Sequence, residues 1–275
     1  MVNAHRITVG DAICISLHEG GGTSDLEGIK GRFPDVSESD LIAALDGQTE
    51  TLGSLNCLYI DLNGTKILAD VGFGIARRPD LGNVDLALQS VGVQPADIDI
   101  VYLTHFHGDH IAGLLTPEGN PTYPNARYVT SNAEWQEWIP RWEASEQEYH
   151  KQLLNMMTSL EDKFAFVDDG DEVIAGVTVV LIPGHTLGQT GLLVESNGER
   201  FIHVADLLHQ TFQFAHTDWH FAFDSDGTMA SKTRADMLER CATENLLAMF
   251  YHLPFPGIGH VKKDGAVYQW QAIEI

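Results

Sequence analysis

The chain has 275 residues, 44% of them hydrophobic, which is enough to bury a large core in one α/β or sandwich-type domain. Its formal net charge of −23 argues against nucleic acid as a partner, because phosphate binding depends on lysine and arginine. The sequence contains no run of 18 apolar residues, and its N-terminus lacks the basic and apolar blocks of a signal peptide. We therefore expect a cytoplasmic protein with no membrane partner. Its three cysteines, Cys14, Cys57 and Cys241, lie far apart and are expected to be free thiols.

The first quarter of the chain predicts strands interrupted by one irregular segment. Residues 5–19 alternate loosely between apolar and polar and predict one or two strands. Residues 20–54 are rich in Gly, Ser and Asp and predict a long loop with a short helix near ESDLIAAL. We expect this segment to act as a lid or as the contact of a homodimer. Residues 55–72 predict two strands joined by the hairpin signal Asn63-Gly64.

The rest of the chain alternates predicted helices with predicted strands. In order, these are a helix over 83–93, short strands at 97–103 and 126–130, helical residues 132–160, hairpins at 172–184 and 190–206, an amphipathic helix over 228–244, and a final strand, loop and hairpin. Two sheets packed face to face with helices outside fit this order, in a single domain over 1–275. Tryptophans recur at helical spacing in the longest helical segment, and we expect them to pack between helices rather than line a substrate pocket. They are Trp135, Trp138 and Trp142.

The stretch THFHGDHIAG, residues 104–113, concentrates histidine and aspartate directly after an apolar strand. His105 and His107 point the same way on an extended strand end, because the strand period is two, and can share one cation. Asp109 is a predicted helix N-cap, and the turn into that helix aims Asp109 and His110 at a second cation. Neutral imidazole and carboxylate are suitable ligands for Zn, Fe, Mn or Co.

Further metal-competent side chains follow other predicted strands. His185 lies in LIPGHTLGQTG, Asp206 ends the strand RFIHVAD, and His252 follows the strand in LLAMFYHLPFPGIGH. Functional residues gather on loops that a rigid sheet carries, so we expect these three to join the first cluster. His260 in the same motif is a weaker candidate than His252, because His252 follows the strand directly.

Five motifs in order resemble the metallo-β-lactamase-fold hydrolase superfamily over residues 55–262. They are LADVGFG with Asp70, the H-x-H-x-D-H cluster, G-H-T-x-G-x-T-x-G, a strand ending in Ala-Asp, and a late strand ending in His. HLPFPGIGH and FAFDSDG most resemble the branch of methyl-parathion-hydrolase-like organophosphatases and related lactonases. The resemblance implies an αββα sandwich of two mixed β-sheets, with helices on the outer faces, and a dinuclear metal centre.

The resemblance also implies a role for each candidate residue. The first metal would be bound by His105, His107 and His185, the second by Asp109, His110 and His252, and both by the bridging Asp206. Asp70 would orient a ligand histidine. Zinc is the default metal, although Fe, Mn and Co suit the same ligands. Asp206 and Asp109 are the candidates for catalytic roles.

Several other residues near these motifs have two interpretations. His203 lies within a strand and is expected in the core or on the surface. On the loop after Asp206, packing or solvent exposure is favoured over substrate contact for His209, His216 and His220. Four aromatic side chains are as compatible with an apolar pocket as with the core, namely Phe106, Phe212, Phe214 and Trp219.

The implied centre predicts hydrolysis. Two cations lower the pKa of a bridging water from about 15.7 to near 7, and the resulting hydroxide attacks an electrophilic carbonyl or phosphorus. Asp206 would pass a proton to the leaving group. We expect a small neutral ester substrate, a lactone first, with an organophosphate triester or aryl ester as the alternative. A non-catalytic binding module is disfavoured, because all seven ligand positions are filled.

Overall fold

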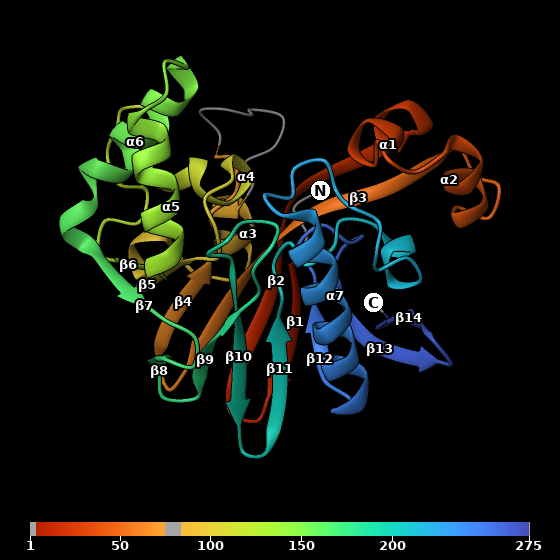
Figure 1. Cartoon of the computed structure of the whole chain (residues 1–275). Coiled ribbons are helices and arrows are strands. Elements are labelled where there is room, and N and C mark those ends of the chain that lie inside the picture. Colours follow the sequence, from red (N-terminus) through yellow and green to blue (C-terminus); the bar gives the residue numbers. More distant parts are fainter. Residues whose placement is uncertain (1–3, 75–83, 275) are drawn as a thin grey trace.

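In the computed structural model, which describes residues 4–74 and 84–274, two seven-stranded β-sheets lie face to face between helices (Figure 1). The first sheet runs in chain order through β1 (Ala4–Val9), β2 (Ala12–Asp25), β3 (Glu50–Leu62), β4 (Thr65–Ala69), β5 (Ile100–Leu103), β6 (Arg127–Ser131) and β7 (Phe164–Val167). The second sheet consists of β8 (Glu172–Ile174), β9 (Val177–Leu181), β10 (Thr190–Ser196), β11 (Glu199–His203), β12 (Leu247–Met249), β13 (Ile258–Asp264) and β14 (Val267–Ala272). Both sheets are mixed, because β4 to β7 pair in parallel and β11 pairs in parallel with β12.

Three apolar cores hold these layers together, as the αββα prediction requires. The helices are α1 (Leu26–Arg32), α2 (Glu38–Ala44), α3 (Val84–Ser90), α4 (Gly108–Ile111), α5 (Asn132–Glu143), α6 (Glu148–Ser159) and α7 (Gly227–Thr243). Leu88 of α3 and Trp142 of α5 pack against the outer face of the first sheet. Ile60 and Leu192 fill the space between the sheets, and Leu238 of α7 packs on the second sheet. The predicted fold class is therefore confirmed.

The expectation of a long loop over 20–54 is wrong. β2 continues to Asp25 and β3 begins at Glu50, and the two strands stay paired up to these residues, with α1 and α2 between them. Gly20, Gly21 and Gly22 form cross-strand pairs within this long hairpin, although glycine normally weakens a strand interior. Figure 1 shows the hairpin and its two helices extending from the body of the molecule. Its role as a lid or dimer contact stays a prediction.

The strand ends bring the candidate residues to one edge of the sandwich. β4 leads into Asp70, β5 into the THFHGDHIAG stretch, β11 toward Asp206 and β12 toward His252. The two sheets are joined there by a hydrogen bond from the backbone N–H of Thr190 to the carbonyl of Thr104, 3.0 Å long. The segment before Thr190 carries His185.

The remaining predictions are largely confirmed. Each predicted hairpin is present, and α3 begins at Val84, with residue 83 outside the described residues. Strand β7 was not predicted from the sequence.

Trp138 and Trp142 are buried, which confirms helix packing, and none of the three tryptophans lines the main cavity. The three cysteines are free and buried. No described helix combines the length and the apolar composition that a membrane crossing requires.

His203 on β11 is fully buried between Leu192 of β10 and Met249 of β12, and burial lowers its pKa to about 4. The imidazole of His203 binds a proton near pH 6.5 in the unfolded chain, but only near pH 4 in the folded chain. Stability should therefore fall as the pH drops through this window, by about 1 kcal/mol per pH unit. In His203→Leu, denaturant unfolding at several pH values with a chelator present should show a shallower decline. Equal slopes in both proteins would contradict this account.

Candidate metal centre

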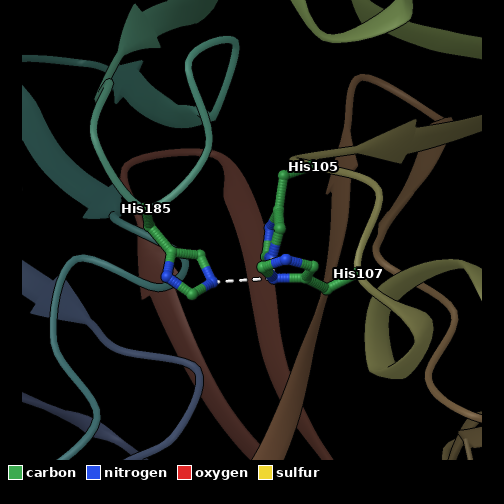
Figure 2. A group of neighbouring side chains, drawn as sticks. All are labelled: His105, His107 and His185. Atoms are coloured by element: carbon green, nitrogen blue, oxygen red, sulfur yellow. Dashed lines mark hydrogen bonds between the residues drawn. The ribbon is translucent and has the colours of Figure 1, made fainter. Parts of the chain in front are cut away.

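Three histidines from two loops converge on one point (Figure 2). His105 and His107 come from the loop after β5, and His185 comes from the loop between β9 and β10. His107 Nδ1 lies 3.1 Å from His105 Nε2 and 2.8 Å from His185 Nε2. Two imidazole nitrogens bound to one tetrahedral zinc lie roughly 3.4 Å apart, so this trio has nearly the spacing of a metal-binding set.

Asp206 lies at the centre of the wider cluster. Its Oδ2 is 3.8 Å from His105 Nε2, 3.4 Å from His185 Nε2 and 2.9 Å from His252 Nε2. Its Oδ1 lies 3.2 Å from His110 Nε2. The side chain is nearly inaccessible to solvent. One carboxylate thus contacts both halves of the predicted ligand set, as a bridging ligand would.

The second predicted set also lies together. Asp109 Oδ2 is 3.8 Å from His110 Nε2 and 3.5 Å from His252 Nε2. Asp109 is not the helix N-cap, because α4 begins at Gly108 and His107 occupies the cap position. Asp109 instead lies in the first turn, where its side chain points toward the cluster. The structure therefore brings all seven predicted ligands together, whereas His260 lies on β13; their assignment as ligands stays a prediction.

Buried carboxylates behind the histidines hold the rings in orientation. Asp70 Oδ2 lies 2.8 Å from His110 Nδ1, and Asp70 also accepts hydrogen bonds from the N–H and hydroxyl of Thr104. Asp224 Oδ1 lies 3.0 Å from His185 Nδ1, while its Oδ2 lies 3.6 Å from the Arg234 guanidinium of α7. A ring held through Nδ1 presents Nε2 to the centre, which is how carboxylates orient metal-binding histidines.

Glu134 in the first turn of α5 connects the two loops that carry the first trio. Its Oε1 accepts the backbone N–H of Phe106 at 2.8 Å, and its Oε2 accepts the hydroxyl of Thr186 at 2.6 Å. The residue is fully buried, and burial raises the pKa of its carboxyl to about 8. This role could not be predicted from the sequence, because a glutamate near a helix start is usually an exposed first-turn residue.

The electrostatics of the cluster fit divalent cations. Burial lowers the pKa of His105 and His107 well below the usual value, so both rings are neutral and keep a lone pair for a metal. Burial alone would lower the pKa of His110, but Asp206 and Asp70 raise it well above the usual value. The buried Nε2 of His110 and Oδ1 of Asp206 lie 3.2 Å apart, but neither atom makes a hydrogen bond of good geometry with a described residue. Positive charge is thus favoured beside these two atoms, which are both able to bind a metal ion.

His209 belongs to the cluster, although the sequence favoured packing or solvent exposure for it. Its Nε2 lies 3.1 Å from Asp206 Oδ2, and its ring stacks on Phe221 with 3.6 Å between centroids. Burial lowers its pKa to about 3, so the ring is neutral. The position three residues after Asp206 was the available signal, but this loop has no periodicity that would show which histidine turns inward.

A cavity of about 670 Å³ opens over the cluster. Its lining includes His107, Asp109, Asp206 and His252 of the predicted set. The apolar part of the wall consists of Leu55, Phe73, Phe221 and Phe223. The four aromatic side chains considered from the sequence do not line it: Phe106, Phe212 and Phe214 are buried in the cores, and Trp219 packs beside Phe212.

The fold and the cluster define the class of protein. A family model of the metallo-beta-lactamase superfamily matches residues 51–248, well over half of the chain. The chain therefore belongs to the metallo-β-lactamase superfamily, as the motif order indicated.

Solved structures of two relatives cover nearly the whole chain. One is AidC, described as a dizinc quorum-quenching lactonase in complex with the product N-hexanoyl-L-homoserine. It has a TM-score of 0.90 and 26% identity, covering 100% of this chain and 98% of that one. Another is the hydrolase AbOPH of the beta lactamase superfamily, with a TM-score of 0.87 and 25% identity, covering 100% and 99%.

Curated relatives match over shorter stretches. The N-acyl homoserine lactonase of Bacillus cereus is 25% identical over 166 residues, which is 60% of this chain and 60% of the relative. The chain spans less than two thirds of the length of the curated relatives it matches, with 63% for a probable metallo-hydrolase of Mycobacterium tuberculosis.

Glu134→Ala should loosen the centre without removing a predicted ligand. The Phe106 N–H and the Thr186 hydroxyl would lose their buried acceptor, at a cost of about 1–3 kcal/mol in the free energy of unfolding. Metal should be lost to a competing chelator more readily than in the wild type. Glu143→Ala, at an exposed position of the same helix, is the matched control. Unchanged metal retention in Glu134→Ala would show that the two loops are held in place by other contacts.

Proposed function

We propose that this protein is a dinuclear metal-dependent hydrolase that opens small neutral lactones. The observation that carries the proposal is the position of the histidine–aspartate cluster at a cavity with an apolar wall. An acidic chain with such a cavity suits a small uncharged ester better than a nucleic acid. The resemblance to AidC and to the N-acyl homoserine lactonase of Bacillus cereus supports the choice of a lactone.

The proposed ligand sets follow the two halves of the cluster. His105, His107 and His185 would hold one cation, Asp109, His110 and His252 the other, and Asp206 both. Two divalent cations, with zinc as the first choice, would polarise the ester carbonyl and supply a nucleophilic water at neutral pH. Mixed imidazole and carboxylate ligands are also compatible with Fe, Mn or Co.

The chain's own carboxylates have different proposed roles. Burial opposes the charge on Asp206, but His252 and His110 hold its pKa well below the usual range. Asp206 is therefore poorly suited to carry a proton, and its main contribution would be as a bridging ligand. Asp109 is partly exposed and lines the cavity, so it is better placed to pass a proton to the leaving oxygen. His209 would hold Asp206 Oδ2 through its Nε2–H.

Metal analysis of the purified protein should find about two equivalents per chain. Asp206→Ala and His107→Ala should each lose metal and abolish hydrolysis while circular dichroism shows a folded protein. His5→Ala on β1 is the matched control, because that histidine belongs to none of the clusters. A wild-type protein that binds no metal, or either variant with full activity, would refute the proposed centre.

A substrate panel separates the lactone from the alternative esters. Acyl-homoserine lactones and simple γ- and δ-lactones should be hydrolysed with a higher kcat/KM than paraoxon-type triesters and aryl acetates. The reason is the apolar part of the cavity wall, which suits the hydrocarbon portion of an acyl lactone. If the metal-loaded enzyme hydrolysed triesters but no lactone, the organophosphate alternative would replace our proposal.

A further inference from the structure

The main cavity contains an arginine that the proposed reaction does not use. Arg32 ends α1 in the long hairpin and lines the same cavity as five of the predicted metal ligands. No other lysine or arginine of the described chain lines this cavity. The lining of the cavity therefore includes a guanidinium as well as metal-competent side chains.

The base of this arginine is firmly held. Its backbone carbonyl accepts the N–H of Ala222 at 2.7 Å. The next residue, Phe33, is fully buried and packs against Phe212 and Phe221, with ring centroids 4.9 and 5.5 Å away. Phe221 itself lines the cavity and stacks on His209. The position of Arg32 is thus connected to the cluster through packed aromatic rings.

The Arg32 guanidinium has donors to spare. A guanidinium carries five N–H donors, and the structure records one hydrogen bond from it, in which Nη1 donates to Ser24 Oγ at 2.8 Å. Among the described residues, no carboxylate forms an ion pair with it. Four other arginines do have carboxylate partners, namely Arg141, Arg200, Arg234 and Arg240. In a chain with a net charge of −23, a cavity-lining arginine without such a partner indicates an acceptor that comes with the ligand.

The surroundings of Arg32 decide what kind of acceptor fits. Asp25 and Glu50 line the adjoining pocket, which Arg32 and Ser24 share with the main cavity. These two carboxylates would repel a negatively charged group on a ligand. A neutral carbonyl oxygen accepts the same hydrogen bonds from Arg32 without that electrostatic cost. The apolar wall near Phe221 and Phe223 suits a hydrocarbon chain next to such a carbonyl.

We propose that Arg32 and Ser24 form a subsite for a neutral carbonyl oxygen, such as the amide oxygen of an N-acyl side chain, away from the scissile ester. This inference rests on the proposed lactonase function and narrows its substrate class. Arg32 is then a specificity residue, because it distinguishes acylated lactones from plain alkyl lactones.

The test compares two lactones in Arg32→Met, which keeps an apolar stem but removes the donors. N-hexanoyl-homoserine lactone carries the amide, and α-heptyl-γ-butyrolactone has the same chain length without it. For the amide substrate, KM should rise roughly tenfold or more with kcat within about twofold, since a hydrogen bond from a charged donor is lost. For the alkyl lactone, both constants should stay within about twofold. Arg200→Met, which removes the same charge outside the cavity, is the matched control.

Each other result has a definite meaning. Equal losses on both lactones, or no loss on either, would overturn the subsite while leaving the lactonase function intact. A wild-type preference for a lactone with a side-chain carboxylate would overturn the choice of a neutral acceptor. If the wild type opened neither lactone, calorimetric binding of the intact, neutral N-hexanoyl-homoserine lactone would decide. Binding that weakens roughly tenfold in Arg32→Met would retain the subsite although the proposed function had failed, and absent or unchanged binding would overturn the subsite too.

Discussion

The buried carboxylate of Asp206 is the constraint on which the rest of the centre depends. A negative charge with almost no solvent access is costly unless positive charge or hydrogen-bond donors surround it. His105, His110, His185 and His252 all lie within 3.8 Å of its oxygens. Protonated rings would supply the positive charge that the carboxylate needs. Most of them cannot be protonated at the same time, because neighbouring imidazolium ions repel one another. Divalent cations would resolve this conflict, since they would balance the carboxylates while the rings stay neutral.

The outer carboxylates turn this cluster of loops into a rigid site. Glu134 connects the first two histidine loops to α5, on the outer face of the first sheet. Asp224 contacts both His185 and Arg234, which lies on α7 against the second sheet. The two outer helical layers therefore each hold part of the predicted ligand set. The sandwich positions these residues not only through its strand ends but also through side-chain contacts from α5 and α7.

The sequence predicted the residues whose role follows from their neighbours in the chain, and it missed those whose role depends on partners that are distant in the chain. His105 and His107 were predicted as a pair from their two-residue spacing in an extended segment, and the loop after β5 brings both to the cluster. The grouping of His185 and His252 with them came from their places after predicted strands and from motif order. Glu134 and His209 could not be found, since their partners are distant in the chain or lie on a loop without a regular period. The hairpin over 20–54 was misread because its glycines suggested a loop, whereas pairing between β2 and β3 stabilises them as strand.

The hairpin and the sheet edge contribute different properties to the cavity. Metal-competent side chains come from the strand ends, where packing of two sheets fixes their geometry and leaves little room for change. The hairpin supplies Ser24, Arg32 and Leu55, which are far from any predicted ligand in the sequence. Hydrogen bonds such as Thr51 Oγ1 to Gln210 Oε1 attach this hairpin to the loop after Asp206. Substitutions on the hairpin would therefore alter the preference among the proposed ester substrates without disturbing the predicted metal ligands.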